Sequence, residues 1–348
     1  MLENRDEKME TRNADTSNWT PSQEEGFALS YSSGTTIETC EYKYACHKVW
    51  NLIPDREDDT TALRWGKACH QIMEDTDWVA SNFTKELFHK ALVEQGFARI
   101  AESGRLIYEE TGEQPCYAIY SACQQLFKLF KKQKMTTVKC EHEIKLPYLY
   151  GFIDQIIKDS KGHWWIRDLK TSGQIRKEEL GARLIRDRQL TLYALPQVIQ
   201  RICDTYHLEA DKFQGVRYTV VFKTKAKVKM DAKGSLEKLS EYAERNTPNC
   251  LDYEIPANQL DVETIYKEHM KKVKQGLEIR TGKREPKRSY GSACFAFNRP
   301  CNYFSRCYGV KAEDVAIKTI EADKARALKP VITCKDKEEN VEEVLNLF

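Results

Sequence analysis

Two aspartates and a lysine interrupt apolar runs in the stretch from Gly151 to Gly173, GFIDQIIKDSKGHWWIRDLKTSG. They are Asp154, Asp168 and Lys170. Two carboxylates held close together can share one divalent cation, and an ammonium beside them can orient water or offset negative charge. Without a cation or hydrogen bonds, two such carboxylates on an apolar face would repel each other and lose hydration. The pattern therefore indicates a metal site that activates water.

The elements that must position these residues are two strands joined by a turn. β-Branched and aromatic residues flank the turn formers Asp159-Ser160-Lys161-Gly162. A tight turn centred on Lys161 places Asp154 directly across from Asp168, with β-carbons roughly 5 Å apart. Because side chains alternate along a strand, seven residues of the hairpin then lie on one face: Phe152, Asp154, Ile156, Trp164, Ile166, Asp168 and Lys170. A slip of one residue in the turn would instead move this whole set to the opposite face.

The surrounding pattern predicts an α/β domain. Apolar spacing of three and four predicts helices over 61–79, 84–103 and 116–134, followed by a strand over 136–150 that leads into the hairpin. A helix over 188–208, kinked at Pro196, and a strand over 213–229 come next. A last helix is expected over 262–279. The alternating lysines of the later strand are typical of a solvated edge: Lys223, Lys225, Lys227 and Lys229.

Four short motifs, in this order, resemble the PD-(D/E)XK nuclease superfamily. They look most like its RecB/AddB-like branch, which includes phage-type exonucleases and the CRISPR adaptation nuclease. The motifs span residues 66 to 193 and are G-x-x-x-H at Gly66 and His70, G-x-x-D at Gly151–Asp154, D-x-K-T at Asp168–Thr171, and Q-x-x-x-Y at Gln189 and Tyr193. The resemblance implies a restriction-endonuclease-like αβββαβ core with a mixed central sheet, plus an N-terminal helical region and a C-terminal cysteine-rich segment.

The resemblance also implies a ligand set for Mg²⁺ or Mn²⁺. Asp154 and Asp168 would bind the ion together with the backbone carbonyl of Leu169 and the imidazole of His70. Imidazole suits Mn²⁺ better than Mg²⁺, which favours manganese. From its context alone a core histidine is favoured for His70, and the G-x-x-x-H match reverses that preference. Glu141 and Glu143 could add a carboxylate, although an exposed strand edge is the expected place for both.

The reaction implied is hydrolysis of phosphodiester bonds. Lys170 would orient or help deprotonate the attacking water and offset charge on the phosphate. Gln189 and Tyr193, four apart and so on one helix face, would position DNA or the lysine, and ordinary packing is the alternative.

A second constellation consists of cysteines. Twelve cysteines in a chain without a secretory leader are not expected to form disulfides. Cys294, Cys301 and Cys307 lie close together in CFAFNRPCNYFSRC and need a fourth partner. The resemblance supplies Cys40, with Cys46 as a spare, to hold a [4Fe-4S] cluster that ties the two ends of the domain together. A four-thiolate Zn²⁺ site or plain burial are the alternatives.

A basic segment precedes the cysteine trio. Residues 271–291 carry eight basic side chains against two acidic ones, and the aromatic residues Tyr290, Phe295 and Phe297 lie at and just beyond the end of this segment. A DNA track is predicted there, with a solvated face as the alternative. Its candidate residues are Lys283, Arg284, Lys287 and Arg288. The chain ends in EEVLNLF, which faintly resembles the short apolar peptides that dock sliding clamps, although a chance amphipathic end is favoured.

The chain of 348 residues is divided into a disordered leader (1–26), a helical region (27–135), the nuclease core (136–230), a C-terminal region with the basic segment and the trio (231–310), and a charged tail (311–348). Its polar N-terminus and the lack of a long apolar run predict a cytoplasmic protein with no membrane contact.

The net charge of +2 leaves DNA binding to local clusters. The leading hypothesis is a metal-dependent DNA exonuclease, or single-strand endonuclease, in recombination, repair or phage DNA processing. It would act on DNA with a single-stranded end. A helicase would have to be a partner, since no P-loop motif is present. The alternatives are a catalytically silent iron-sulfur DNA-binding subunit and a CRISPR adaptation nuclease.

Overall fold

A computed structural model describes residues 27–55, 61–75, 84–102, 106–108, 113–172, 184, 187–224, 226–230, 232, 236–248, 250–296 and 299–309. The predicted leader, the charged tail and the C-terminal EEVLNLF peptide lie outside these ranges.

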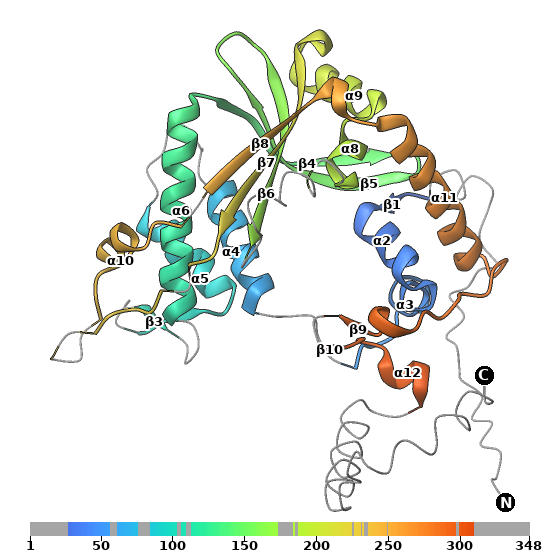
Figure 1. Ribbon diagram of the computed structural model, residues 1–348, viewed down its shortest axis with the longest axis horizontal. Coiled ribbons are helices and arrows are strands. Elements are labelled where there is room, and N and C mark those ends of the chain that lie inside the picture. The colour runs from blue at the N-terminus through green and yellow to red at the C-terminus, as the bar shows by residue number, and fades with distance from the viewer. Residues whose placement is uncertain are drawn as a thin grey trace, which may run out of the picture.

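A mixed sheet of six strands forms the centre of the fold (Figure 1). Its strands are β1 (Leu29–Ser30), β4 (Thr136–Leu146), β5 (Leu149–Lys158), β6 (Trp164–Ser172), β7 (Phe213–Phe222) and β8 (Cys250–Pro256). β5 pairs antiparallel with both β4 and β6, and β7 with β8, whereas β1–β5 and β6–β7 are parallel. The predicted restriction-endonuclease-like class with a mixed central sheet is confirmed.

The predicted hairpin register is also confirmed. Gln155 pairs with Arg167 and Ile156 with Ile166, which is the alignment that places Asp154 across from Asp168. The predicted strict alternation of faces is wrong, because Ile153 and Ile156, three residues apart, both pack in the same buried cluster, while Phe152 is 43% exposed. The physical reason is that β5 changes its pairing at this point.

One edge of β5 is open around the aspartate. β4 pairs along the full length of β5, so β1 and β6 must share the other edge. On that edge β1 pairs at Leu149 and Tyr150, and β6 pairs from Gln155 onward. The backbone from Gly151 to Asp154 lies between these two partners. The strands β5 and β6 therefore part where the two aspartates stand, which opens room for their side chains.

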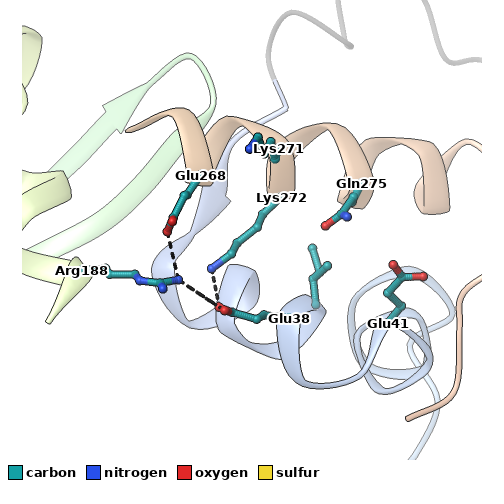
Figure 2. Close-up of a pocket in the computed structure, with 8 residues that line it drawn as sticks. Glu38, Glu41, Arg188, Glu268, Lys271, Lys272 and Gln275 are labelled. Carbon is teal, nitrogen blue, oxygen red and sulfur yellow. Dashed lines mark hydrogen bonds and ion pairs between the residues drawn. The ribbon is translucent and has the colours of Figure 1, made fainter. Parts of the chain in front are cut away.

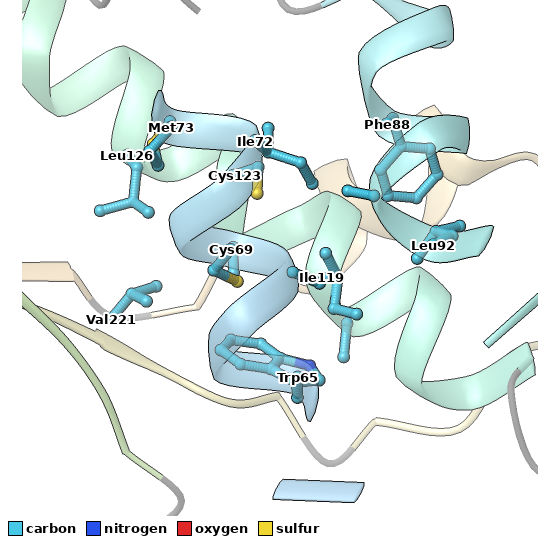
Figure 3. Close-up of a cluster of buried hydrophobic side chains, with 14 of the residues drawn as sticks. Trp65, Cys69, Ile72, Met73, Phe88, Leu92, Ile119, Cys123, Leu126 and Val221 are labelled. Atoms are coloured by element: carbon cyan, nitrogen blue, oxygen red, sulfur yellow. The ribbon is translucent and has the colours of Figure 1, made fainter. Parts of the chain in front are cut away.

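One face of the sheet is covered by α4 (Thr61–Asp75), α5 (Lys85–Glu94) and α6 (Glu113–Gln133), with α10 (Leu239–Arg245) beside α6. Their apolar sides meet in a buried cluster that reaches Leu169 and Val221 of the sheet (Figure 3). The three predicted helices exist, but the second stops at Glu94. Gly96, with φ +67°, turns the chain there, and β2 (Ala98–Ile100) then pairs with β3 (Leu106–Tyr108).

The other face of the sheet packs on α8 (Arg188–Tyr193) and α9 (Pro196–Tyr206). A single kinked helix was predicted here, and the structure has two. Pro196 is the first residue of α9, a position at which its missing N–H costs no hydrogen bond. The break leaves α8 as a short, separate helix carrying Gln189 and Tyr193.

A third buried cluster lies at the β1 end of the sheet. It joins α2 (Tyr31–Thr39), α3 (Glu41–Tyr44), the π-helix η2 (Ala45–Val49) and α11 (Val262–Arg280). Figure 1 shows this group on the opposite side of the molecule from α4, α5 and α6. The cysteine trio follows in short elements: η5 (Gly291–Ala293), β9 (Phe295–Ala296), β10 (Arg299–Pro300) and α12 (Phe304–Tyr308).

Two predictions about the later strands are corrected. The strand predicted over 213–229 ends at Phe222, so Lys223, Lys227 and Lys229 follow it rather than lining its edge, and Lys225 lies outside the described residues. β8 was read only as a polar stretch. Its charged side chains pair with the neighbouring strand, as Asp252 does with Arg217 at 3.0 Å. None of the helices in the described ranges combines the length and the apolar character that a membrane span requires.

Candidate active site

Asp154 is held by the backbone of the neighbouring strand. The Leu169 N–H donates a hydrogen bond of 2.8 Å to Asp154 Oδ2. This contact crosses the gap in which β5 and β6 have stopped pairing, so the carboxylate takes the place of a strand partner. Asp154 is therefore fixed at the mouth of the opening between the strands.

His70 reaches the same point from α4. Its Nε2 lies 2.8 Å from the Leu169 carbonyl oxygen, and its Nδ1 lies 3.7 Å from Asp154 Oδ2. A carbonyl only accepts, so in this arrangement Nε2 carries the proton. Gly66, one turn earlier, explains the close approach, because a Cβ there would lie 3.2 Å from Thr171 Oγ1. The G-x-x-x-H spacing thus serves to bring the histidine against β6.

Asp168 is buried, with 2% of its surface exposed, and faces Lys170. The Lys170 Nζ lies 3.0 Å from Oδ1 and 2.9 Å from Oδ2. Only the Oδ1 contact has hydrogen-bond geometry, which leaves Oδ2 without a hydrogen-bond donor. Burial and the nearby charge of Asp154 raise the pKa of Asp168, and Lys170 opposes this shift.

Lys170 stays protonated in this environment. Burial lowers its pKa, but the adjacent charge of Asp168 outweighs burial, and the pKa of Lys170 is raised. A permanently charged ammonium donates hydrogen bonds and cannot accept a proton. Of the roles expected for Lys170, orienting water and offsetting phosphate charge therefore fit the geometry better than proton abstraction.

Gln189 and Tyr193 complete a chain of contacts that ends at Asp168. The Lys170 Nζ donates to Gln189 Oε1 at 3.2 Å, and Gln189 Nε2 donates to the Tyr193 hydroxyl at 3.4 Å. Tyr193 is buried against Gly151, where an added Cβ would lie only 2.5 Å from the hydroxyl oxygen. The structure thus brings the two motif residues to the lysine and gives the motif glycine a steric reason.

Glu141 joins this group from β4, where sequence reasoning favoured an exposed edge. Ligand atoms of His70, Glu141 and Asp154 all lie within 4.8 Å of one another, and this is the one His/Cys/Asp/Glu group of three so closely spaced among the described residues. Burial and the charges of Asp154 and Glu74 raise the pKa of Glu141 to about 7. The signal that could have found it is the register of β4, which aligns Glu141 with Asp154.

The structure also brings the predicted cysteines together. Cys40 caps α3, and Cys46 lies fully buried in η2. Across the chain, the Cys301 N–H donates to the Cys294 carbonyl at 2.7 Å, and Cys307 follows in α12. Burial first, and then the neighbouring thiols, raise the pKa of Cys46 to about 12 and of Cys307 to about 11.

The predicted DNA-binding segment makes several contacts within the protein. Arg284 donates to both carboxylate oxygens of Glu41, at 2.6 and 3.2 Å, and the Lys287 N–H donates to the same side chain at 3.0 Å. Arg288 donates to the Cys307 carbonyl at 3.1 Å and lies over the Tyr42 ring. At least the two arginines therefore anchor the segment to α3 and the cysteine region.

A charged pocket of about 350 Å³ lies beside α8, between α2 and α11 (Figure 2). Arg188, the residue before Gln189, pairs there with Glu38 at 3.3 Å and with Glu268 at 3.2 Å. Lys272 pairs with the same Glu38. Arg188 and Lys272 already pair with acidic side chains of this pocket, so we assign the pocket to holding α8 in place rather than to a ligand.

The family of this chain follows from comparison with known proteins. A search of curated protein sequences finds no match. Among solved structures, a chain from Eubacterium rectale that is provisionally described as an exonuclease aligns over 84% of this chain and 98% of its own, with 15% identity and a TM-score of 0.45. The profile of the PD-(D/E)XK nuclease superfamily matches residues 28–308. The chain therefore belongs to the PD-(D/E)XK nuclease superfamily.

Proposed function

We propose that this protein is a metal-dependent DNA exonuclease, or single-strand endonuclease, of the RecB/AddB-like branch. The observation that carries the proposal is the convergence of His70, Asp154 and the Leu169 backbone at the opening beside Asp168 and Lys170. The proposal extends to a role in recombination, repair or phage DNA processing in the cytoplasm, with a helicase or sliding clamp as possible partners.

The donor set fits a divalent cation. It offers an imidazole, carboxylates and a backbone carbonyl, which are ligands that Mn²⁺ and Mg²⁺ accept. The buried Oδ2 of Asp168 receives no hydrogen bond although the Lys170 ammonium lies 2.9 Å away, so this oxygen keeps lone pairs that a divalent cation can use. We propose His70, Asp154, Asp168 and the Leu169 carbonyl as ligands. When bound, the ion would lower the pKa of a water molecule and polarise the phosphoryl oxygen.

The protein's own residues supply the positioning. Lys170 would donate to the attacking water or to a phosphate oxygen, and the contact from Gln189 fixes its direction. Tyr193 in turn holds Gln189, so the lysine is oriented by two residues of α8. The Leu169 N–H keeps one oxygen of Asp154 in place, which would reduce the reorganisation needed when substrate binds.

A single-stranded substrate is supported by the surface next to the site. Phe152 is 43% exposed and stands two residues before Asp154 on β5, roughly 7 Å along the strand. The Tyr150 ring packs edge-on against it, with ring centroids 5.5 Å apart. Exposed aromatic rings beside a nuclease site offer a stacking surface to unpaired bases. We propose that Phe152 contacts a base near the cleaved phosphate.

We also propose that Cys40, Cys294, Cys301 and Cys307 hold a [4Fe-4S] cluster. Four thiolates around a single Zn²⁺ ion lie about 3.8 Å apart, given Zn–S bonds of about 2.3 Å. Among the described cysteines no three sulfur atoms all lie within 4.8 Å of one another, so this spacing favours the larger cluster over a single Zn²⁺ ion. Lys43 and Arg288 add positive charge beside Cys301 and Cys307, which suits an anionic cluster.

Anaerobic purification followed by a cleavage assay tests the proposal. Brown colour with near-ultraviolet and visible absorption would support the cluster, and a colourless protein with one bound Zn²⁺ would contradict it. DNA strands labelled at either end, single and double, would be incubated with Mn²⁺ or Mg²⁺. Cleavage by the wild type and its loss in Asp168→Ala and Lys170→Ala, with DNA binding retained, is the expected result. Equal activity in all three proteins would overturn the nuclease assignment.

A further inference from the structure

Glu141 stands opposite Asp154 in the β4–β5 pair. The flanking residues fix this, since Cys140 pairs with Gln155 and His142 with Ile153. Directly opposed residues of antiparallel strands share a face and have β-carbons about 5 Å apart. Glu141 itself has φ +46°, which is uncommon for a residue other than glycine within a strand. The carboxylate of Glu141 nevertheless lies on the side of Asp154, because ligand atoms of the two residues are within 4.8 Å of one another.

The distances suit one small cation. Ligand atoms of His70, Glu141 and Asp154 lie within 4.8 Å of one another. Ligands at about 2.1 Å from an octahedral ion lie about 3.0 Å apart when adjacent and about 4.2 Å apart when opposite. A small adjustment of side chains would therefore bring all three donors onto one ion.

The histidine is turned in the way a ligand requires. Its Nε2–H donates to the Leu169 carbonyl, which leaves the Nδ1 lone pair on the side of Asp154. Metal-binding histidines commonly anchor one ring nitrogen on a carbonyl in this manner while the other binds the ion. The Leu169 carbonyl orients His70 through one lone pair, and its second lone pair remains for the ion.

The charges also balance. Lys170 lies about 3 Å from both oxygens of Asp168, so this carboxylate already has a positive partner. With Lys170 offsetting one of the two charges of Asp154 and Asp168, these carboxylates offer the ion a net charge of one negative unit. Glu141 raises that net charge to two, which matches a divalent ion.

We infer that Glu141 is a further side-chain ligand of the divalent cation, together with His70 and Asp154. The inference rests on the proposed function, because it assigns a residue to the metal site of that nuclease. It adds a carboxylate from β4 to the ligands that the family resemblance implies.

Binding of Mn²⁺ to the full-length protein, followed by the electron paramagnetic resonance signal of the free ion, tests this inference without relying on activity. Glu141→Gln keeps the size and removes the charge, and it should weaken Mn²⁺ binding at least ~10-fold. Glu143→Gln is the matched control, because Glu143 lies two residues along the same strand, opposite Phe152. The control should bind Mn²⁺ like the wild type.

The outcomes separate the two proposals. If Glu141→Gln binds Mn²⁺ like the wild type while Asp154→Asn does not, Glu141 is no ligand and the nuclease proposal stands. If Asp154→Asn also binds like the wild type, the metal site itself is wrong. If Glu141→Gln melts at a lower temperature than the wild type in the absence of metal, Glu141→Asp is the deciding variant. Restored Mn²⁺ binding by Glu141→Asp supports Glu141 as a ligand. A Glu141→Asp protein that melts like the wild type but binds Mn²⁺ as weakly as Glu141→Gln overturns the inference.

Discussion

The metal-site region and the cysteine region differ in what holds them in place. Asp154, Asp168 and Lys170 stand on adjacent strands of the central sheet, and the Leu169 backbone contacts both Asp154 and His70. Of the four cysteines proposed as cluster ligands, Cys40 and Cys294 cap the short helices α3 and η5, Cys301 follows the two-residue strand β10, and Cys307 lies in the five-residue helix α12. Sheet hydrogen bonds and buried apolar clusters keep the first region in shape by themselves. The second has few such contacts, so a bound cofactor would contribute much of its stability.

The largest effect is expected from the metal-site region. Asp154→Asn and Asp168→Asn should each lower the cleavage rate by about 1000-fold or more, because the amide cannot supply the charge that a divalent ion requires. The melting temperature should change little, since the sheet does not depend on the ion. Cleavage of end-labelled DNA with Mn²⁺ and a thermal melt of the same samples check both points. A large loss of stability would show that the two regions are not as different as we argue.

The cysteine region should respond in the opposite way. Cys301→Ser removes one proposed cluster ligand and should lower the melting temperature by at least ~5 °C, with loss of the brown colour. Cys203→Ser is the control, since Cys203 packs in the apolar cluster around α9 rather than with the trio. Equal melting of the Cys301 variant and the wild type would remove the structural role that we assign to a cofactor there.

Phe152→Ala tests the surface beside the metal site. Loss of one stacking contact should weaken binding of single-stranded DNA by about 10-fold, corresponding to about 1–3 kcal/mol for each stacked base. Binding of fully double-stranded DNA should hardly change. Fluorescence anisotropy with labelled strands and Ca²⁺ in place of Mn²⁺ measures both affinities. Ile100→Ala, which removes an exposed apolar side chain from β2, is the comparison variant. An equal loss on both DNA forms would argue against base stacking.

The smallest effect is expected from the two lysines of the basic segment. The double variant Lys283→Glu, Lys287→Glu should reduce the slope of log DNA affinity against log salt concentration by the amount expected for about two phosphate contacts. The affinity itself should fall only modestly. Arg284→Glu should instead disturb the cysteine region, because Arg284 is paired with Glu41. DNA titrations at several salt concentrations, with a melt of each variant, separate the two effects. An unchanged salt dependence in the double lysine variant would remove the proposed DNA track.

The sequence by itself determined the local arrangement of the metal site. The alignment of Asp154 with Asp168 followed from turn formers around Lys161, because hairpin register depends on residues close together in the chain. The spacing of Gln189 and Tyr193 likewise predicted one helix face. Gly66 and Gly151 were recognised only as motif positions. The structure shows why glycine is needed there, since Thr171 packs against Gly66 and Tyr193 against Gly151.

Only the tertiary structure decided which distant groups meet. The opening beside Asp154 exists because β1 and β6 share one edge of β5, and no local pattern encodes that. Glu141 looked like an exposed edge residue until β4 aligned it with Asp154, and Arg284 looked like a DNA ligand until α3 brought Glu41 to it. Local propensity acts over a few residues, whereas these contacts depend on how whole elements pack, which is why the chain's pattern alone could not predict them.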